Sequence, residues 1–195
     1  MTLALFIITA FLFGSIPFGY IIGALFFSTD IRKSGSGNIG AMNALRTIGK
    51  GGAVAVLVLD ALKGFVAPFL VLYFHVLPPY GAAAVALAAV LGHCFSPWLG
   101  WKGGKGVATS FGAIFALCPA AGFVAIAGWV LGALLTRYSS AGSMLGSVVA
   151  AFALWYFTRD PWFTAYGILA AAFIVYTHRE NIARLLAGRE NAIKL

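Results

Sequence analysis

The chain contains long runs in which no side chain is charged, and these runs limit the folds open to it. Residues 1–29 carry no charge, and residues 106–136 form an uncharged run of 31 residues. Only 9% of the 195 residues are charged, whereas a soluble domain carries about 25%. Because about 20 apolar helical residues cross a bilayer, we expect an all-α integral membrane protein in which residues 1–195 form a single domain.

The net charge of +8 does not indicate a nucleic-acid partner. Too little of the chain is polar to form a basic face in water, so the charge must orient the chain in the membrane or bind an anionic ligand. The uncharged N-terminus lacks the Lys or Arg that opens a signal peptide, so we expect it to remain as the first helix. Cys94 and Cys118 show no metal or disulfide spacing, and neither a metal nor a cofactor is expected.

Apolar runs separated by charges or prolines predict the membrane-crossing helices. They cover about residues 3–27, 52–74, 80–99, 106–136, 139–157 and 162–177. As one helix the 31-residue run would be about 46 Å long, which exceeds the hydrocarbon thickness, and Pro119 favours a break at Cys118. With this break, 11 of the 13 Lys and Arg lie on one side of the membrane. The positive-inside rule then predicts seven transmembrane helices, with the N-terminus outside and the C-terminus cytoplasmic.

Several glycines inside the predicted spans have a spacing that favours close helix packing. Glycines with G-x-x-x-G spacing, which lets membrane helices approach closely, occur at Gly19/Gly23, Gly128/Gly132 and Gly142/Gly146. We interpret these glycines as packing contacts within one chain and expect a monomer, although dimer contacts use the same spacing.

Asp60 and Lys63 lie three residues apart in the second span. We interpret them as a structural ion pair, although intramembrane charges otherwise mark functional sites.

The first of three polar segments on the predicted cytoplasmic side is a glycine-rich loop, GSGNIG, at residues 35–40. Its glycines let N–H groups turn toward an anion, Ser36, Asn38 and Asn43 add donors, and Arg32, Lys33 and Arg46 supply charge. The loop matches the dinucleotide-binding pattern G-x-G-x-x-G, but a membrane span rather than a strand precedes it. The alternative is a plain connecting loop.

The second segment contains Lys102-Gly103-Gly104-Lys105-Gly106 at the predicted start of a helix. It lacks the first glycine of a P-loop. Ammonium groups amid glycines at a helix start still suit a phosphate, although lysines that only orient the chain in the membrane are the alternative.

The third segment follows the last predicted span. His178 and Asn181 are three residues apart and therefore share one helix face. Ile182, Leu185 and Leu186 form an apolar stripe, which predicts a helix at the membrane surface.

Three polar clusters on one membrane face exceed what anchoring requires. Helix ends that open onto a lipid-filled interior suit a substrate with an acyl chain and an anionic head. A membrane transporter of an anionic solute is the alternative, although it needs polar groups near the bilayer midplane, where only Asp60 and Lys63 qualify. A non-catalytic membrane scaffold is a third possibility.

The three segments resemble the signature regions of the bacterial acyl-phosphate:glycerol-3-phosphate acyltransferases. The matching stretches, in order along the chain, are GSGNIGAMN with Arg46, GHCFSPWLGWKGGKGVATSFG, and THRENIARLL-G. The resemblance implies a seven-helix, multi-pass enzyme of the bacterial cytoplasmic (inner) membrane. Such an enzyme moves a fatty acyl group from acyl phosphate to the sn-1 hydroxyl of glycerol 3-phosphate. The products are lysophosphatidate and phosphate, in the first acylation step of phospholipid synthesis.

The resemblance also implies roles for individual residues. The expected catalytic residues are Ser36, Arg46, Lys105, His178 and Asn181. The residues expected to bind substrate or phosphate are Gly37, Asn38, Gly40, Asn43, His93, Lys102, Gly103, Gly104 and Gly106. Met42 stands where Thr is expected, and Ser96-Pro97 shifts the expected proline by one position. The proton of the attacking hydroxyl goes either to His178, oriented by Asn181, or to a substrate phosphate, and the sequence does not choose between them.

Overall fold

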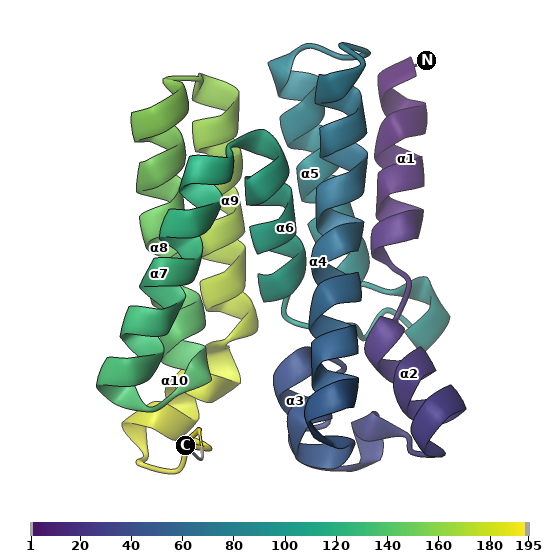
Figure 1. Cartoon of the computed structure of the whole chain (residues 1–195), viewed down its shortest axis with the longest axis vertical. Helices are drawn as coiled ribbons and strands as arrows, with labels where there is room; N and C mark the ends of the chain where they lie inside the picture. The colour runs from purple at the N-terminus through teal and green to yellow at the C-terminus, as the bar shows by residue number, and fades with distance from the viewer. Residues whose placement is uncertain (1, 194–195) are drawn as a thin grey trace.

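The computed structural model describes residues 2–193, and these contain helices but no β-strand. The elements are α1 (Thr2–Gly14), α2 (Phe18–Phe27), η1 (Ile31–Lys33), α3 (Ala41–Thr47), α4 (Gly49–Tyr73), α5 (Pro79–Cys94), η2 (Pro97–Leu99), α6 (Val107–Leu117), α7 (Pro119–Thr136), α8 (Ser139–Thr158), α9 (Pro161–Thr177) and α10 (Arg179–Leu186). The long helices follow the long axis of the molecule. The N-terminus lies at one end, and α2, α3, α10 and the C-terminus lie at the other (Figure 1).

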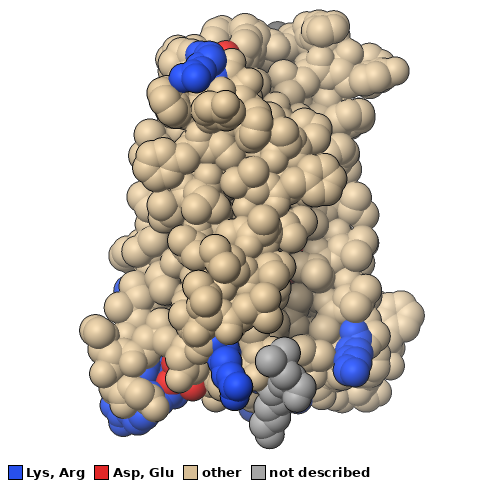
Figure 2. All heavy atoms as spheres, turned by 60° about the vertical axis from the view of Figure 1, so that its left-hand side comes forward, with Lys and Arg blue, Asp and Glu red and all other residues tan. Residues whose placement is uncertain are grey.

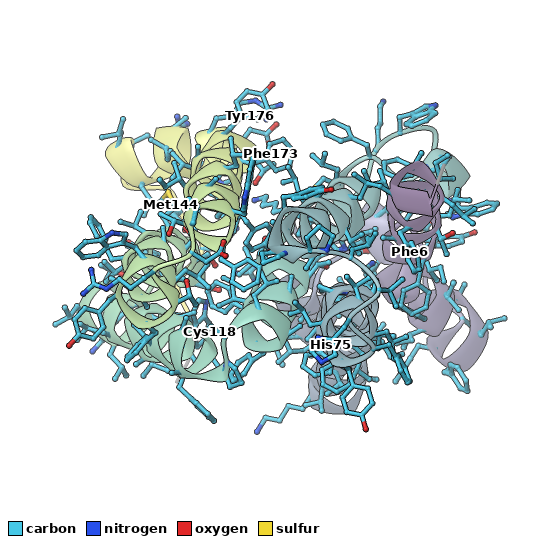
Figure 3. The ribbon with its side chains drawn as sticks, turned by 90° about the horizontal axis from the view of Figure 1, so that it is seen from above. Phe6, His75, Cys118, Met144, Phe173 and Tyr176 are labelled. Atoms are coloured by element: carbon cyan, nitrogen blue, oxygen red, sulfur yellow. The ribbon has the colours of Figure 1, made fainter. Side chains whose placement is uncertain are left out.

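The helices form two groups that lie side by side, with α6 between them (Figure 1, Figure 3). In one group α5 contacts both α1 and α4, and in the other α8 contacts both α7 and α9. α6 packs against α4 on one side and against α7, α8 and α9 on the other. Alanine is frequent in the shared core, because small side chains let membrane helices approach closely.

Five helical segments are long and apolar enough to cross a membrane: Leu3–Phe27, Gly49–Tyr73, Pro79–Leu99, Pro119–Thr136 and Ser139–Thr158. α6, with 11 residues, and α9, with 17, are apolar but shorter. Figure 2 shows Lys and Arg at the two ends of one face, mainly at the lower end, and a middle nearly free of charged side chains. The predicted class, an all-α integral membrane protein, is therefore confirmed, while the number of crossings stays a prediction.

The predicted helix break at Cys118 is confirmed. α6 ends at Leu117, Cys118 is extended with φ −159° and ψ 102°, and Pro119 opens α7. Proline suits the first position of a helix because its missing N–H would have no helical partner there. Within a continuous helix the same ring would clash with the preceding turn.

The first predicted helix, residues 3–27, is wrong as a continuous helix. The segment 15–17 separates α1 from α2. Pro17 has no N–H and its ring opposes a continuous helix, so the chain turns here in the middle of an uncharged run. Unlike the 31-residue run, residues 3–27 are short enough for one crossing helix, so the sequence pattern alone favours one helix.

Distant side chains bind the polar groups that this break frees. Lys63 Nζ donates to Ile16 O at 2.7 Å, and Ser96 Oγ donates to Ser15 O at 2.7 Å. Trp98 Nε1 donates to Ser15 Oγ at 2.8 Å. A polar backbone group without a partner in an apolar interior costs several kcal/mol. These bonds from α4, from the end of α5 and from η2 therefore make the break between α1 and α2 possible.

The G-x-x-x-G glycines of α7 and α8 face one another within the chain. A Cβ atom added at Gly128 would lie 3.1 Å from Gly146 Cα, and one added at Gly132 would lie 2.8 Å from Gly142 Cα. The two helices therefore touch backbone to backbone, which requires glycine at the contact. The interpretation of these glycines as packing within one chain is confirmed.

A single glycine substitution tests the crossing of α4 and α6. A Cβ at Gly64 would lie 1.9 Å from Thr109 O, whereas one at Gly51 of the same helix meets nothing within 4 Å. We expect Gly64→Ala to lower the thermal midpoint in detergent, since overpacking costs about 1–3 kcal/mol. Gly51→Ala should keep or raise the midpoint, because Ala favours helix. Equal midpoints for the two variants would contradict this crossing.

Candidate active site

A pocket of about 550 Å³ has residues of α3 and α10 in its lining. Both helices lie at the lower end of the molecule (Figure 1). The polar part of the pocket combines residues from the 36–40 loop, α3, the 105–106 loop, α8 and α10. Its apolar part continues along α4, α6 and α7. Among the apolar lining residues are Leu57, Phe111, Phe115, Ile126, Trp129 and Val130.

The three polar segments singled out in the sequence meet in this pocket. All five expected catalytic residues line it: Ser36, Arg46, Lys105, His178 and Asn181. Asn38, Gly40, Asn43, His93 and Gly106 line it as well. Gly37, Lys102, Gly103 and Gly104 do not belong to the lining. The convergence of the segments is therefore present, while the role of each residue stays a prediction.

Two asparagines shape the first loop. Asn43 is 2% exposed, and its Oδ1 accepts from Ser36 N at 2.8 Å while its Nδ2 donates to Ile31 O at 2.7 Å. Asn38 Oδ1 accepts from Gly40 N at 2.8 Å. Both side chains are thus engaged with the backbone, and they hold Ser36 at the rim of the pocket.

Ser36 and Arg46 present free polar groups to the pocket. Within the described residues, Ser36 Oγ makes no hydrogen bond and Arg46 makes no ion pair. Arg32, by contrast, forms two hydrogen bonds with Asp30, at 2.9 and 2.8 Å, and its guanidinium lies over the Tyr20 ring. Arg32 is not part of the pocket lining, so the cation that this segment supplies to the pocket is Arg46.

The glycine loop before α6 folds back onto the end of α5. Gly103 N donates to Cys94 O at 2.9 Å, and Gly104 N donates to His93 O at 3.0 Å. A Cβ at Gly103 would lie 2.0 Å from His93 O, and one at Gly104 would lie 2.0 Å from His93 Nε2. Only glycine fits this close approach. The two N–H groups are used inside the protein, and the fold leaves Lys105 at the pocket.

Lys105 belongs to a hydrogen-bond network that joins four parts of the chain. Its Nζ donates to Asn181 Oδ1, and Asn181 Nδ2 donates to Glu190 Oε1 at 2.6 Å. Glu190 also accepts from Arg184 Nε at 2.8 Å and from Ser140 Oγ at 3.0 Å. The network ties the loop before α6 to α8, to α10 and to the segment after α10.

The network sets the protonation of its two central charges. Burial lowers the pKa of the Lys105 ammonium group, and the neighbouring Arg184 lowers that pKa further. Burial acts to raise the pKa of the Glu190 carboxyl, but the hydrogen bonds from Asn181, Arg184 and Ser140 outweigh it and hold that pKa below its usual value. Glu190 is therefore a carboxylate at neutral pH.

His178 caps α9 and is 3% exposed. Its Nδ1 lies 2.7 Å from Ile174 O. A carbonyl oxygen only accepts, so Nδ1 carries the proton and Nε2 carries the lone pair. Burial lowers the pKa of His178 to about 4. The imidazole is therefore neutral at pH 7, with Nε2 as its acceptor atom.

Part of the pocket lining is not predicted from the sequence. Additional polar lining residues are Asp60, Ser139, Ser140, Ser143, Arg184, Glu190 and Asn191. The predicted ion pair of Asp60 with Lys63 is confirmed, with Nζ 2.8 Å from Oδ1. Ser140 and Ser143, three residues apart at the start of α8, carried a helix-face signal that was available in the sequence.

The fold and the pocket define an integral membrane α-helical protein in which cations cluster at one end of a largely apolar pocket. A family model described as Glycerol-3-phosphate acyltransferase matches residues 4–188. A glycerol-3-phosphate acyltransferase of Erythrobacter litoralis is 47% identical over 91% of this chain and 88% of its own length. One of Gluconobacter oxydans is 43% identical over 99% and 94%. The chain belongs to the glycerol-3-phosphate acyltransferase family.

A solved structure agrees with this assignment over the whole chain. PlsY, described as an integral membrane glycerol 3-phosphate acyltransferase in its glycerol 3-phosphate form, is 37% identical with a TM-score of 0.94. The similarity covers 100% of this chain and 96% of that one. Family membership therefore favours the enzyme over the transporter and the scaffold that the sequence left open.

The low pKa of His178 predicts a window in which acid destabilises the fold. As the pH falls, the unfolded chain binds a proton near pH 6.5 and the folded protein only near 4. The stability from neutral His178 is therefore complete above pH 6.5 and is lost between pH 6.5 and about 4, a loss of about 3 kcal/mol. We expect the thermal midpoint in detergent to fall less across this window in His178→Gln than in the wild type. Parallel curves would contradict the buried neutral state.

Proposed function

We propose that the protein transfers a fatty acyl group from acyl phosphate to the sn-1 hydroxyl of glycerol 3-phosphate, giving lysophosphatidate and phosphate. The observation that carries the proposal is the pocket itself, in which Arg46 and Lys105 lie at the polar end of an apolar groove that reaches Phe115. An acyl phosphate has the same division into an anionic head and an apolar tail. The glycerol-3-phosphate acyltransferase family of the chain supports the acceptor.

The chemistry needs no acyl-enzyme. Acyl phosphate is a mixed anhydride, so the glycerol hydroxyl oxygen attacks its carbonyl carbon directly and the bond to the phosphate oxygen breaks. A serine nucleophile requires an adjacent base. Ser36 Oγ has no hydrogen-bonded base among the described residues, so Ser36 is a ligand for a substrate oxygen. Arg46 and Lys105 offset the repulsion between the two substrates and the charge that grows on the leaving phosphate.

A substrate phosphate is the better proton acceptor. The pKa of His178 is about 4, whereas the second pKa of a phosphate monoester is about 6. A base with a pKa nearer the operating pH is more effective. His178 Nε2 then accepts a hydrogen bond that orients the glycerol hydroxyl, and Asn181 holds Lys105 beside it.

We further propose seven crossings, with the N-terminus outside and the C-terminus cytoplasmic, in the bacterial cytoplasmic (inner) membrane. α6 and α9 supply two crossings in addition to the five longer segments. α6 is short because it starts at a loop folded inside the protein rather than at the membrane surface.

We also propose that the enzyme acts as a monomer with a single domain over residues 1–195. The helix-contacting glycines of α7 and α8 are already used inside the chain.

The activity is tested with purified protein in detergent, glycerol 3-phosphate and palmitoyl phosphate. We expect release of phosphate together with lysophosphatidate, measured by mass spectrometry, and far lower kcat/KM with palmitoyl-coenzyme A. Lys105→Ala should lower turnover at least ~10²-fold, the size expected for loss of a donor to a developing anion. Lys102→Ala is the matched control, because Lys102 is exposed and outside the pocket lining.

Two outcomes would contradict the proposal. Equal kcat/KM for the thioester would reject acyl phosphate as the donor. Normal turnover of Lys105→Ala, or an equal loss in Lys102→Ala, would remove Lys105 from the chemistry.

The topology is tested with single cysteines in a Cys94→Ser/Cys118→Ser background. Cysteines at Lys33, Lys102 and Arg189 should all react with a membrane-impermeant maleimide from the cytoplasmic side. A cysteine at His75, in the turn after α4 (Figure 3), should react from the opposite side. Labelling of positions 33 and 189 from opposite sides would mean an even number of crossings.

A further inference from the structure

Three ionisable side chains lie together in the apolar interior, at the wall of the pocket. Asp60 is 1% exposed, Lys63 0% and His93 4%. Asp60 Oδ1 is 2.8 Å from Lys63 Nζ and 3.6 Å from His93 Nδ1. Ionisable groups in such surroundings are costly, and a buried ion pair is weak evidence for stability. The cluster therefore calls for a role beyond packing.

The two partners of Asp60 have different tasks. Lys63 Nζ also donates to Ile16 O, so it belongs to the break between α1 and α2. His93 and Asp60, unlike Lys63, line the pocket. Asp60 Oδ1 is paired with Lys63 Nζ, whereas His93 Nδ1 has no hydrogen-bond partner within the described residues and lies 3.6 Å from Asp60 Oδ1, just beyond hydrogen-bond distance.

The other edge of the His93 ring supports the glycine loop. Its Nε2 would lie 2.0 Å from a Cβ at Gly104, and Gly104 N is bonded to His93 O. The ring and the loop are thus in close contact, so a rotation of the imidazole displaces the backbone of the loop. Lys105 follows Gly104 directly and reaches Asn181 across the pocket.

From this chain of contacts we infer that Asp60 is a positioning residue for Lys105. Its carboxylate fixes the His93 ring through Nδ1, the ring sets the position of Gly104, and the loop thereby holds the Lys105 ammonium group at the reacting phosphate. Asp60 itself touches no reacting atom. The inference rests on the proposed function, because it assigns the purpose of the loop to the phosphate site.

The test separates this role from that of a structural ion pair. Asp60→Asn alone leaves the Lys63 charge buried and unpaired, which can prevent folding. The charge-neutral pair Asp60→Asn/Lys63→Gln avoids this problem and keeps an amide donor for Ile16 O. Tyr166→Phe is the control, since Tyr166 is buried, donates to Ser110 O and lies outside the pocket lining.

We expect the neutral pair to keep a thermal midpoint close to that of the wild type while kcat/KM with palmitoyl phosphate falls at least ~10-fold, because a 1 Å misplacement of a catalytic group costs up to about 10²-fold. Amide hydrogen exchange at residues 102–106 should become faster. Adding His93→Gln should cause little further loss, as expected for residues that act in series. Tyr166→Phe should change neither turnover nor exchange in the loop.

Wild-type kcat/KM with unchanged exchange in the neutral pair would overturn the inference and leave Asp60 as a structural partner of Lys63. Fully additive losses from Asp60 and His93 would overturn it as well. If the wild-type protein itself shows no turnover, the proposed function fails. Hydrogen exchange at residues 102–106 still decides whether Asp60 positions the loop.

Discussion

A backbone carbonyl at the end of a helix needs a hydrogen-bond donor when that end lies in an apolar interior. In this protein two helix ends lie in the interior, and much of the surrounding structure supplies their donors. At the first, between α1 and α2, Lys63 and Ser96 supply the donors. At the second, beyond the end of α5, Gly103 and Gly104 donate to the last carbonyls of the helix. The two places are connected, because Lys63 pairs with Asp60, and Asp60 faces the imidazole of His93.

The end of α5 and the loop that follows it determine how α6 lines the pocket. The chain returns into the molecule after α5, so α6 begins at an interior loop and is only 11 residues long. Its first turn follows Lys105, and its side reaches Phe111 and Phe115 in the apolar part of the pocket. One short helix therefore connects the ammonium group with the surface suited to an acyl chain. A continuous helix starting at the membrane surface could not place both in one cavity.

The sequence predicts features whose cause is local. Pro119 marks its own helix break, and the polar segments are visible because glycine and charge are rare elsewhere in their surroundings. The break at Pro17 was missed, since its stabilising partners are 47 and 81 residues away along the chain. Glu190 was missed for a similar reason. Its place depends on the bend after α10, which brings the carboxylate to Asn181 and Ser140.

The charged side chains that line the pocket bear on the proposed binding of a phosphate. Burial lowers the pKa of the Lys105 ammonium group, and the nearby Arg184 lowers that pKa further. Glu190, the acid closest to Lys105 through Asn181, is already bonded to Arg184. In the proposed function, a phosphate between Arg46 and Lys105 pairs with both cations and favours the charged form of Lys105. In the proposed function, substrate binding and the stabilisation of the leaving phosphate therefore use the same two cations, which the fold brings to one pocket.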